Sequence, residues 1–300
     1  MEKRDDEFAV VVAHPDDEIL FASSIIDKAT KIFVCFSDIP GESAINIRQT
    51  KGRKNVQKLY PIDNITFLDL PQASNKNALK NNWDKVVENQ YGVEGGRNEQ
   101  EYKQNFQKLF KILSIELVDF KKVYTHNPWG EYGHVEHIQI HRCMTKLKEI
   151  IGFEMFIFGY LSRDTIKMAN LKLRNLGKLS LKKNNKELFY KIKNLYIDEK
   201  CWTWSDYHTP PDYEIFYQYA DTNKFREKSK FLKRKLIYIY HPIYSRRIRC
   251  CMYDTSSILF KIFMLQNKYL FRLRNFILNL FLRSLIQKLL ITKNVFYPSK

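Results

Sequence analysis

The chain has 300 residues, of which 44% are hydrophobic and 28% charged, and its formal net charge is +17. This composition is ordinary for a globular protein of one or two domains, and the five cysteines form no CxxC pair, which argues against a disulfide framework. The first ten residues show no signal peptide and no run of 18 uncharged apolar residues occurs, so we expect a cytoplasmic protein without a membrane-spanning helix.

Apolar runs of strand length alternate with helical patterns over the first 160 residues. The expected strands are 8–13, 31–36, 65–70, 122–125 and 153–160. The expected helices follow four of these strands and begin near residues 16, 48, 106 and 135. Residues 72–100 are polar and predicted to be irregular, and residues 163–200, rich in Lys and Asn, are predicted to be helical. The alternation indicates a doubly wound α/β sheet.

The first strand runs directly into ionisable residues in the stretch VVVAHPDDE, residues 10–18. Ligands of open α/β sheets bind beyond the carboxyl ends of the strands, where His14, Asp16 and Asp17 stand. For the two aspartates alone, helix capping is an equally good explanation, because Pro and Asp are typical of a first helical turn. A histidine at this place has no capping role, so the motif as a whole favours a functional site.

A second polar segment, THNPWGEYGHVEHIQIH at residues 125–141, holds four of the seven histidines. His134, His137 and His141 have the spacing of one helical face. One such pair is more often a polar helix face than a site. Together with the HxxD turn at residues 14–17, however, the segment offers two imidazoles and a carboxylate, the ligands of open catalytic zinc sites. Zinc is the expected ion, with Fe²⁺ as the alternative, because no thiolate is present.

The two motifs in this order, AHPDDE and then GHxxH, resemble the PIG-L/LmbE-like zinc-dependent N-acetylglucosaminyl deacetylases. Gly41-Glu42 followed by Arg48, and the strand ITFLDLP at 65–71, add to the likeness, which covers residues 6–160 well and 160–220 loosely. The resemblance implies a Rossmann-like fold, a Zn²⁺ cofactor and removal of the N-acetyl group from an amino sugar, free or lipid-linked.

The resemblance also implies a role for each matching residue of the two motifs. His14, Asp17 and His137 would bind the metal. Asp16 would be the general base that takes a proton from water. His134 would act as general acid or would stabilise the oxyanion. Replacement of Asp16 is then expected to reduce turnover while metal remains bound, whereas replacement of His137 is expected to remove the metal.

Two further residues take substrate-binding roles by the same resemblance. Arg48 would hold a substrate hydroxyl or phosphate, and Tyr132 would line the pocket and polarise the carbonyl. Three positions depart from the family pattern: Lys51 replaces an acid, Tyr60 a glycine and Asn127 an aspartate. If the missing aspartate orients the acid histidine, a glutamate of the 125–141 segment would have to compensate.

Residues 201–219, CWTWSDYHTPPDYEIFYQY, are dense in Trp and Tyr. A wall on which a sugar ring stacks is one interpretation. A strand and loop that pack over the sheet form the other, and it is the one we favour. His208 is expected to be structural.

The positive charge is concentrated at the C-terminal end. Residues 224–300 contain 18 of the 50 Lys and Arg but only two of the 33 Asp and Glu. We therefore predict a deacetylase domain at 1–223 and a basic amphipathic helical extension at 224–300. The pattern within 257–291 favours binding to an anionic membrane surface on the cytoplasmic side. A hairpin packed on the core, or a dimer interface, is the alternative, and nucleic acid is not expected as a partner.

Three functional hypotheses follow from the sequence. The first is an N-deacetylase acting on an N-acetylated amino sugar, with that sugar as its partner. The second keeps the metal site but acts on another amide, such as a thiol conjugate or an antibiotic precursor. The third is a non-catalytic, membrane-associated scaffold. Metal content and acetate release distinguish them.

Overall fold

The computed structural model describes residues 7–73, 86–94, 98–220, 235–239 and 251–254. The chain divides into two compact units, Met1–Asp254 and Thr255–Lys300. The whole second unit, including the amphipathic helix predicted within 257–291, lies outside the described residues.

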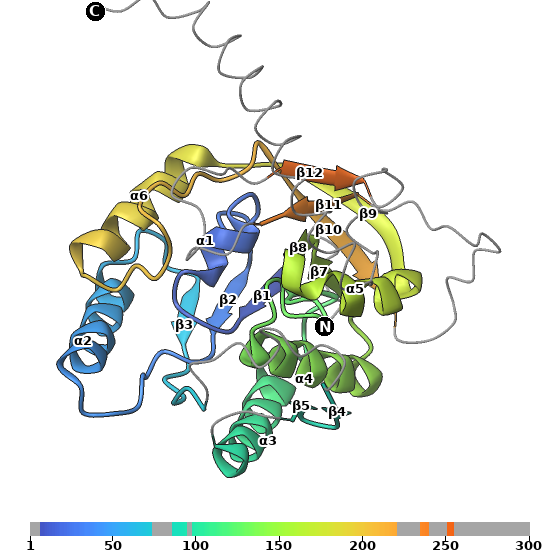
Figure 1. Ribbon diagram of the computed structural model, residues 1–300, viewed down its shortest axis with the longest axis horizontal. Helices are drawn as coiled ribbons and strands as arrows, with labels where there is room; N and C mark the ends of the chain where they lie inside the picture. The colour runs from blue at the N-terminus through green and yellow to red at the C-terminus, as the bar shows by residue number, and fades with distance from the viewer. Residues whose placement is uncertain (1–6, 74–85, 95–97, 221–234, 240–250, 255–300) are drawn as a thin grey trace, which may run out of the picture. The chain divides into compact units, whose positions relative to one another are not determined.

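A seven-stranded sheet forms the centre of the first unit, in the order β3-β2-β1-β6-β7-β10-β9 (Figure 1). Its strands are β1 (Phe8–Val12), β2 (Lys31–Val34), β3 (Ile65–Phe67), β6 (Lys122–Thr125), β7 (Glu154–Phe158), β9 (Leu176–Lys183) and β10 (Tyr213–Tyr219). The first five strands in spatial order are parallel, and β10 is antiparallel to both β7 and β9. The predicted α/β fold with a mostly parallel sheet is confirmed.

Helices cover both faces of this sheet. They are α1 (Asp17–Ala22), α2 (Ala44–Leu59), α3 (Glu99–Glu116), α4 (Val135–Ile151), α5 (Ile166–Lys172) and α6 (Lys186–Asp198). The crossovers through α1 and α2 run toward one edge, and those through α3 and α4 run toward the other. Right-handed crossovers therefore place the two pairs on opposite faces. Helix α6 packs with α1 and α2, while α3 packs with α4 (Figure 1).

Strand β1 lies in the middle of the sheet, and its sequence FAVVV suits this position. Val10 pairs with Ile32 of β2 on one side and with Tyr124 of β6 on the other. All of its residues except Phe8 are buried. A parallel strand covered by helices on both faces is expected to be a continuous apolar run, which explains the lack of alternation.

The prediction of helix throughout 163–200 is wrong over 176–183, which form the edge strand β9. Leu and Lys both favour helices, but Leu179 and Leu181 recur with a period of two, and the segment pairs with β10. Sheet pairing therefore overrides local helix propensity here. Within 72–100, predicted to be irregular, the structure has the hairpin β4 (Glu88–Asn89) and β5 (Gly92–Val93) and the start of α3.

A second sheet has the order β12-β11-β8. Its strands are β8 (Tyr160–Leu161), β11 (Lys235–Tyr238) and β12 (Cys251–Asp254). Strand β11 is parallel to β8 and antiparallel to β12, so strand pairing continues beyond residue 223. The domain boundary at 223/224 stays a prediction. The first compact unit of the structure extends further, to Asp254.

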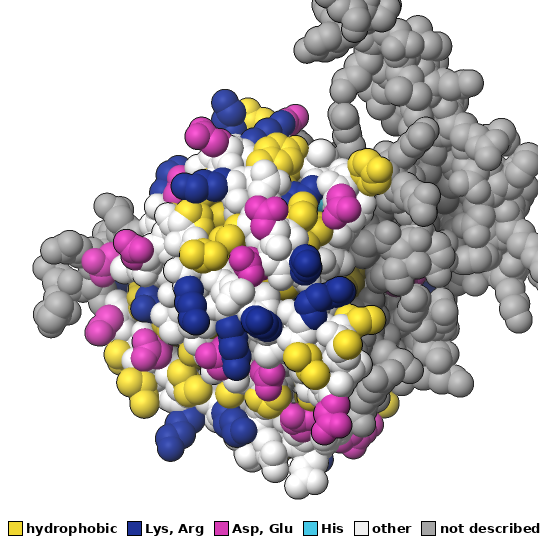
Figure 2. Space-filling view, turned by 90° about the vertical axis from the view of Figure 1, so that its left-hand side faces the viewer, with side chains coloured by type: hydrophobic (Ala, Val, Ile, Leu, Met, Phe, Trp, Pro, Cys, Tyr) yellow, Lys and Arg dark blue, Asp and Glu magenta, His cyan; other side chains and the backbone are white. Residues whose placement is uncertain are grey.

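Among the helices that the structure describes, none is long and apolar enough to cross a membrane. On the face toward α2 and α6, Lys and Arg side chains are interspersed with acidic and apolar ones (Figure 2). This mixture agrees with the near-neutral charge of the first 223 residues.

Candidate functional site

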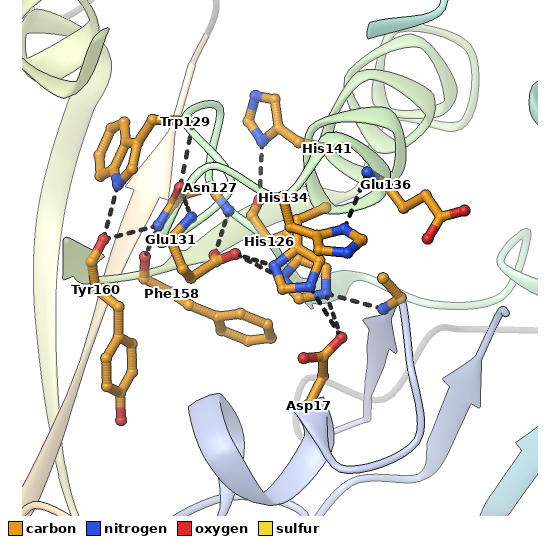
Figure 3. Close-up of polar contacts among 12 residues, drawn as sticks. Asp17, His126, Asn127, Trp129, Glu131, His134, Glu136, His141, Phe158 and Tyr160 are labelled. Atoms are coloured by element: carbon orange, nitrogen blue, oxygen red, sulfur yellow. Dashed lines mark hydrogen bonds and ion pairs between the residues drawn. The ribbon is translucent and has the colours of Figure 1, made fainter. Parts of the chain in front are cut away.

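Both polar segments singled out in the sequence lie at the switch point of the large sheet. The chain leaves β1 for β2 on one side, whereas β6 lies on the other side of β1. Ligands of open α/β sheets bind beyond the carboxyl ends of the strands at such a point. Residues 14–18 follow β1 and the turn at 126–134 follows β6. Asp17 at the start of α1 accordingly points toward the imidazoles of the second segment (Figure 3).

Three buried side chains, His14, Asp17 and His137, converge here, and we call them the metal trio. His14 Nδ1 lies 3.1 Å from Asp17 Oδ2, and His137 Nε2 lies 3.2 Å from the same oxygen and 3.3 Å from His14 Nδ1. Two ligands about 2.0–2.2 Å from a tetrahedral ion are about 3.3–3.6 Å apart. The three atoms are therefore spaced almost as the ligands of a single ion are. Binding of an ion would require only a slight increase in the distances between them.

Each histidine of the trio is held by a carboxylate on its other ring nitrogen. Glu131 Oε2 lies 2.6 Å from His137 Nδ1, and Glu136 Oε2 lies 2.6 Å from His14 Nε2. Metal-binding histidines commonly donate their second N–H to such a partner, which fixes the tautomer and the ring plane. The nitrogens that face Asp17 are therefore the ones whose lone pairs can bind an ion.

His14 and Asp17 are both charged when no ion is bound. Burial opposes charge at His14, but hydrogen bonds to Asp17 and Glu136 raise its pKa to about 9. Burial also acts against the Asp17 carboxylate, yet His137 and His14 hold its pKa well below the ordinary value. Since a metal ligand must be deprotonated, an ion that binds here displaces the proton of His14.

His126 lies beside the trio but differs from it in its hydrogen bonds. Its Nε2 is 3.6 Å from Asp17 Oδ2, and Asp17, His126 and His137 form another group that could hold an ion. However, Nε2 accepts the backbone N–H of Ala13 at 2.8 Å, and Nδ1 lies 2.9 Å from Glu131 Oε2. The lone pair of Nε2 is thus already engaged. Burial also lowers the pKa of His126 to about 3, so the ring is neutral and supports Glu131.

Asp16 lies next to the trio with φ of 95°, a conformation that residues other than glycine rarely adopt. Its N–H donates to Glu18 Oε2 at 2.9 Å, and Glu18 Oε1 accepts the hydroxyls of Tyr60 and Tyr196 at 2.9 and 2.8 Å. Its carboxylate is 2% exposed and accepts hydrogen bonds from the N–H and hydroxyl of Thr203. Burial raises the pKa of this carboxyl well above its ordinary value. Strained residues held in this way cluster at functional sites.

His134 is the N-cap of α4, where its Nδ1 accepts the N–H of Glu136 at 3.3 Å. Its ring centroid lies 4.5 Å from that of His14 and 4.8 Å from that of His137. Burial and the charges of these two histidines hold its pKa well below the ordinary value, so the ring is neutral. Because Nδ1 accepts a hydrogen bond, the proton of the neutral ring is assigned to Nε2. Such a ring is suited to donate a hydrogen bond to an oxyanion.

The aromatic segment forms a loop and strand β10, which lies within the sheet between β7 and β9. In the loop, the Trp204 ring lies 5.5 Å from that of Tyr132 and 6.2 Å from that of Phe21. Tyr132 in turn lies 5.2 Å from the ring of His137. The loop therefore borders the site. No pattern in the sequence indicated that its Thr203 contacts Asp16.

The two arginines of α2 lie in different surroundings. Arg48, the residue assigned to substrate binding from the sequence, is exposed. Arg53 is 3% exposed and donates from Nη1 to the carbonyl of Ser37 at 3.4 Å, just beyond the end of β2. Its charge acts to lower the pKa of Asp16. No acceptor for the buried Nε occurs among the described residues. Helix periodicity could have identified Arg53, since Gly52 and Val56 on the same helix are also buried.

Asn127 organises the turn after β6. Its amide donates to the carbonyls of Phe158 and Tyr160 at 2.9 and 3.0 Å, and its side-chain oxygen accepts the N–H groups of Trp129 and Glu131 at 3.2 and 3.0 Å (Figure 3). This network fixes the turn that presents Glu131 to His137. Glu131 and Glu136, two carboxylates of the 125–141 segment, bind the two histidines of the trio.

Tyr60, which replaces the family glycine, has a clear structural role, because its hydroxyl binds the buried Glu18. Lys51 is exposed on α2. Nothing in the structure explains the lysine.

Replacing Glu131 with Gln is expected to weaken metal binding about ten- to a hundredfold, because the charged partner of the His137 ring is lost. Competition between the protein and a chromophoric chelator measures this affinity. Glu149→Gln, on the exposed face of helix α4, is the matched control. Equal affinities for wild type and Glu131→Gln would show that the carboxylate does not support a ligand.

Comparison with known proteins finds one family model that matches the part of the chain that forms this site. Residues 9–148, which contain the whole metal trio, match the model of the family described as PIG-L, GlcNAc-PI de-N-acetylase. No curated protein sequence matches the chain.

Several solved structures are similar at low identity. The zinc-inhibited form of teicoplanin deacetylase Orf2 has 10% identity and a TM-score of 0.48, covering 73% of this chain and 99% of that one. The A40926 pseudoaglycone deacetylase Dbv21 has 11% identity and a TM-score of 0.44, covering 72% and 99%. The N,N'-diacetylchitobiose deacetylase from Pyrococcus horikoshii has 10% identity and a TM-score of 0.37, covering 66% and 71%. Similarity at this level transfers no substrate to this chain. The resemblance expected from the two motifs is nonetheless confirmed by the family match, and residues 9–148 of this chain match the PIG-L family model.

Proposed function

We propose that this chain is a metal-dependent hydrolase that removes the N-acetyl group from an amino sugar of a glycan or glycoconjugate. One observation carries the proposal: His14 Nδ1, Asp17 Oδ2 and His137 Nε2 lie within 3.3 Å of one another, beside the buried carboxylate of Asp16. Two imidazoles and a carboxylate suit Zn²⁺, with Fe²⁺ as the alternative. The family match supports the choice of an N-acetyl substrate.

A divalent ion held by the trio would supply Lewis acidity, which lowers the pKa of a water ligand to about 7 and polarises the substrate carbonyl. Asp16 accepts a proton from the attacking water as the new carbon–oxygen bond forms. His134 Nε2–H and the Tyr132 hydroxyl donate hydrogen bonds to the developing oxyanion. When the carbon–nitrogen bond breaks, Asp16 returns the proton to the leaving amine. The products are acetate and a free amino sugar.

Arg53 is a better candidate than Arg48 for holding a substrate hydroxyl or phosphate. Five positions along a helix turn the direction of a side chain by about 140°, so the two arginines face different sides. Arg53 is buried and its charge acts on Asp16, and among the described residues its Nε has no acceptor. Replacing Arg53 with Ala is expected to raise KM about tenfold or more, because a hydrogen bond to a charged donor is lost.

Steady-state kinetics of Arg53→Ala, Arg53→Lys and Arg48→Ala test this assignment. Arg53→Lys keeps the charge and should recover part of the affinity, while Arg48→Ala should keep the wild-type KM. A raised KM for Arg48→Ala, with Arg53→Ala unchanged, would restore the assignment made from the sequence.

Acetate release from a panel of N-acetylhexosamine conjugates, soluble and lipid-linked, tests the proposed function. Zinc-loaded protein should release acetate and free amine in equal amounts from at least one conjugate, and Asp16→Ala should release none. Bound metal without acetate release would favour an amidase acting on a thiol conjugate or antibiotic precursor. Absence of metal binding would favour a non-catalytic scaffold.

Residues 224–300 are part of the proposal as a peripheral anchor on the cytoplasmic face of the membrane. Their 18 basic and two acidic residues support an anionic lipid surface as the partner. Co-sedimentation with vesicles containing phosphatidylserine should be weakened when residues 255–300 are replaced by a neutral linker, a change that keeps β11 and β12.

A further inference from the structure

The loop at residues 201–208, between α6 and β10, contacts the candidate general base directly. Thr203 donates to Asp16 Oδ2 from its backbone N–H at 3.3 Å and also from its hydroxyl. The two residues are 187 positions apart in the chain. Thr203 itself is exposed, so its contact with Asp16 is not a by-product of core packing. It also lies outside residues 9–148, the part that the family model matches.

Lys193 of α6 holds the 201–208 loop in place. Its Nζ donates to the carbonyls of Asp206 and His208, the latter at 3.0 Å, and lies 5.5 Å from the centre of the Trp202 ring. The lysine is 4% exposed. A buried ammonium group that binds two loop carbonyls and an aromatic face fixes the path of the loop.

Helix α6 also supports the backbone of the base. Tyr196, one turn after Lys193, donates to Glu18 Oε1 at 2.8 Å, and Glu18 Oε2 accepts the N–H of Asp16 at 2.9 Å. This hydrogen bond holds Asp16 in its left-handed conformation. Helix α6 therefore supports the backbone of Asp16 through Glu18, and the loop that follows the helix binds the Asp16 carboxylate.

We propose that Thr203 is a positioning residue for Asp16, brought to it by the loop that Lys193 anchors; this inference rests on the proposed function. By occupying Oδ2, Thr203 fixes the plane of the carboxylate and leaves Oδ1 to accept the proton of the attacking water. Catalysis by a positioned base depends on such orientation. Without the hydroxyl, the carboxylate can rotate and spends less time in the reactive orientation.

Thr203→Val removes the hydroxyl at constant shape, and Thr203→Ser keeps it. We expect Thr203→Val to lower kcat about tenfold, with KM and metal content within about twofold of wild type, since one hydrogen bond to a charged group is lost. Thr203→Ser should keep most of the activity. Thr209→Val, the same change six positions on, should behave as wild type.

Hydrogen exchange of the metal-free protein provides a readout independent of activity. Thr203→Val and Lys193→Met should both speed exchange of the amides at 201–208, whereas Thr203→Ser should not. If Lys193 acts through Thr203, the double variant should lose less kcat than the product of the two single losses.

Several results would overturn the inference. Thr203→Val with the wild-type kcat, or Thr203→Ser as impaired as Thr203→Val, would refute a role for the hydroxyl. A raised KM or lost metal would indicate a different role for the residue. If wild type is active and Asp16→Ala is not, these results concern Thr203 alone. A wild-type protein that binds metal but hydrolyses no N-acetyl conjugate would refute the proposed function and this inference together.

Discussion

Replacing Asp16 with Asn is expected to lower kcat for acetate release by about a hundred- to ten-thousandfold, the usual contribution of a positioned general base. The amide has nearly the shape of the carboxylate, so it can keep the hydrogen bonds that Thr203 donates, but it cannot accept the proton of water. Metal content should stay near that of wild type, because the trio is unchanged. Acetate release and metal analysis on the same protein preparation measure both quantities.

Asp63→Asn is a suitable control, since Asp63 is an exposed aspartate in the turn before β3. It should leave both kcat and metal content unchanged. An Asp16→Asn variant with nearly normal kcat would assign the base to another group. A variant that loses its metal would place Asp16 among the ligands instead.

Replacing His137 with Gln is expected to remove the bound ion and, with it, all measurable turnover. His137 has two roles, because its Nε2 faces the trio and its Nδ1 binds Glu131. His14→Gln should have the same effect, whereas His126→Gln should keep the ion and lose folding stability. Elemental analysis after dialysis against metal-free buffer measures the first effect, and urea unfolding measures the second.

This set of variants distinguishes the metal trio from the group Asp17, His126 and His137, which could also hold an ion. If the ion were held by Asp17, His126 and His137, His126→Gln would lose it and His14→Gln would keep it. The hydrogen bond from the Ala13 N–H to His126 Nε2 argues for the opposite result.

Local sequence patterns predicted the parts of this protein that depend on adjacent residues. The apolar run at 8–12 is followed within two residues by His14, so the strand and the site at its end could be read together. The spacing of His134 and His137 placed them correctly at the start of one helix, α4. The order of the two motifs indicated the family, which the match over residues 9–148 bears out.

Features that depend on contacts between distant parts of the chain could not be predicted from local sequence patterns. His126 has the same side chain as the histidines of the trio, and only the register of β1 against β6 brings the N–H of Ala13 to its ring. Thr203 reaches Asp16 because α6 and the strands around β10 fold back across the sheet, and no motif marks a threonine for that role. Strand β9 has helix-favouring residues and is a strand because β10 pairs with it.

Anomalous diffraction from crystals of the zinc-loaded protein, recorded on both sides of the zinc absorption edge, would locate the ion itself. We expect one peak about 2.0–2.2 Å from His14 Nδ1, Asp17 Oδ2 and His137 Nε2, with the Asp16 carboxylate beside it and outside the coordination shell. A peak coordinated by His126 Nε2 in place of His14, or no peak between the ends of β1 and β6, would contradict the metal site and the hydrolase built on it.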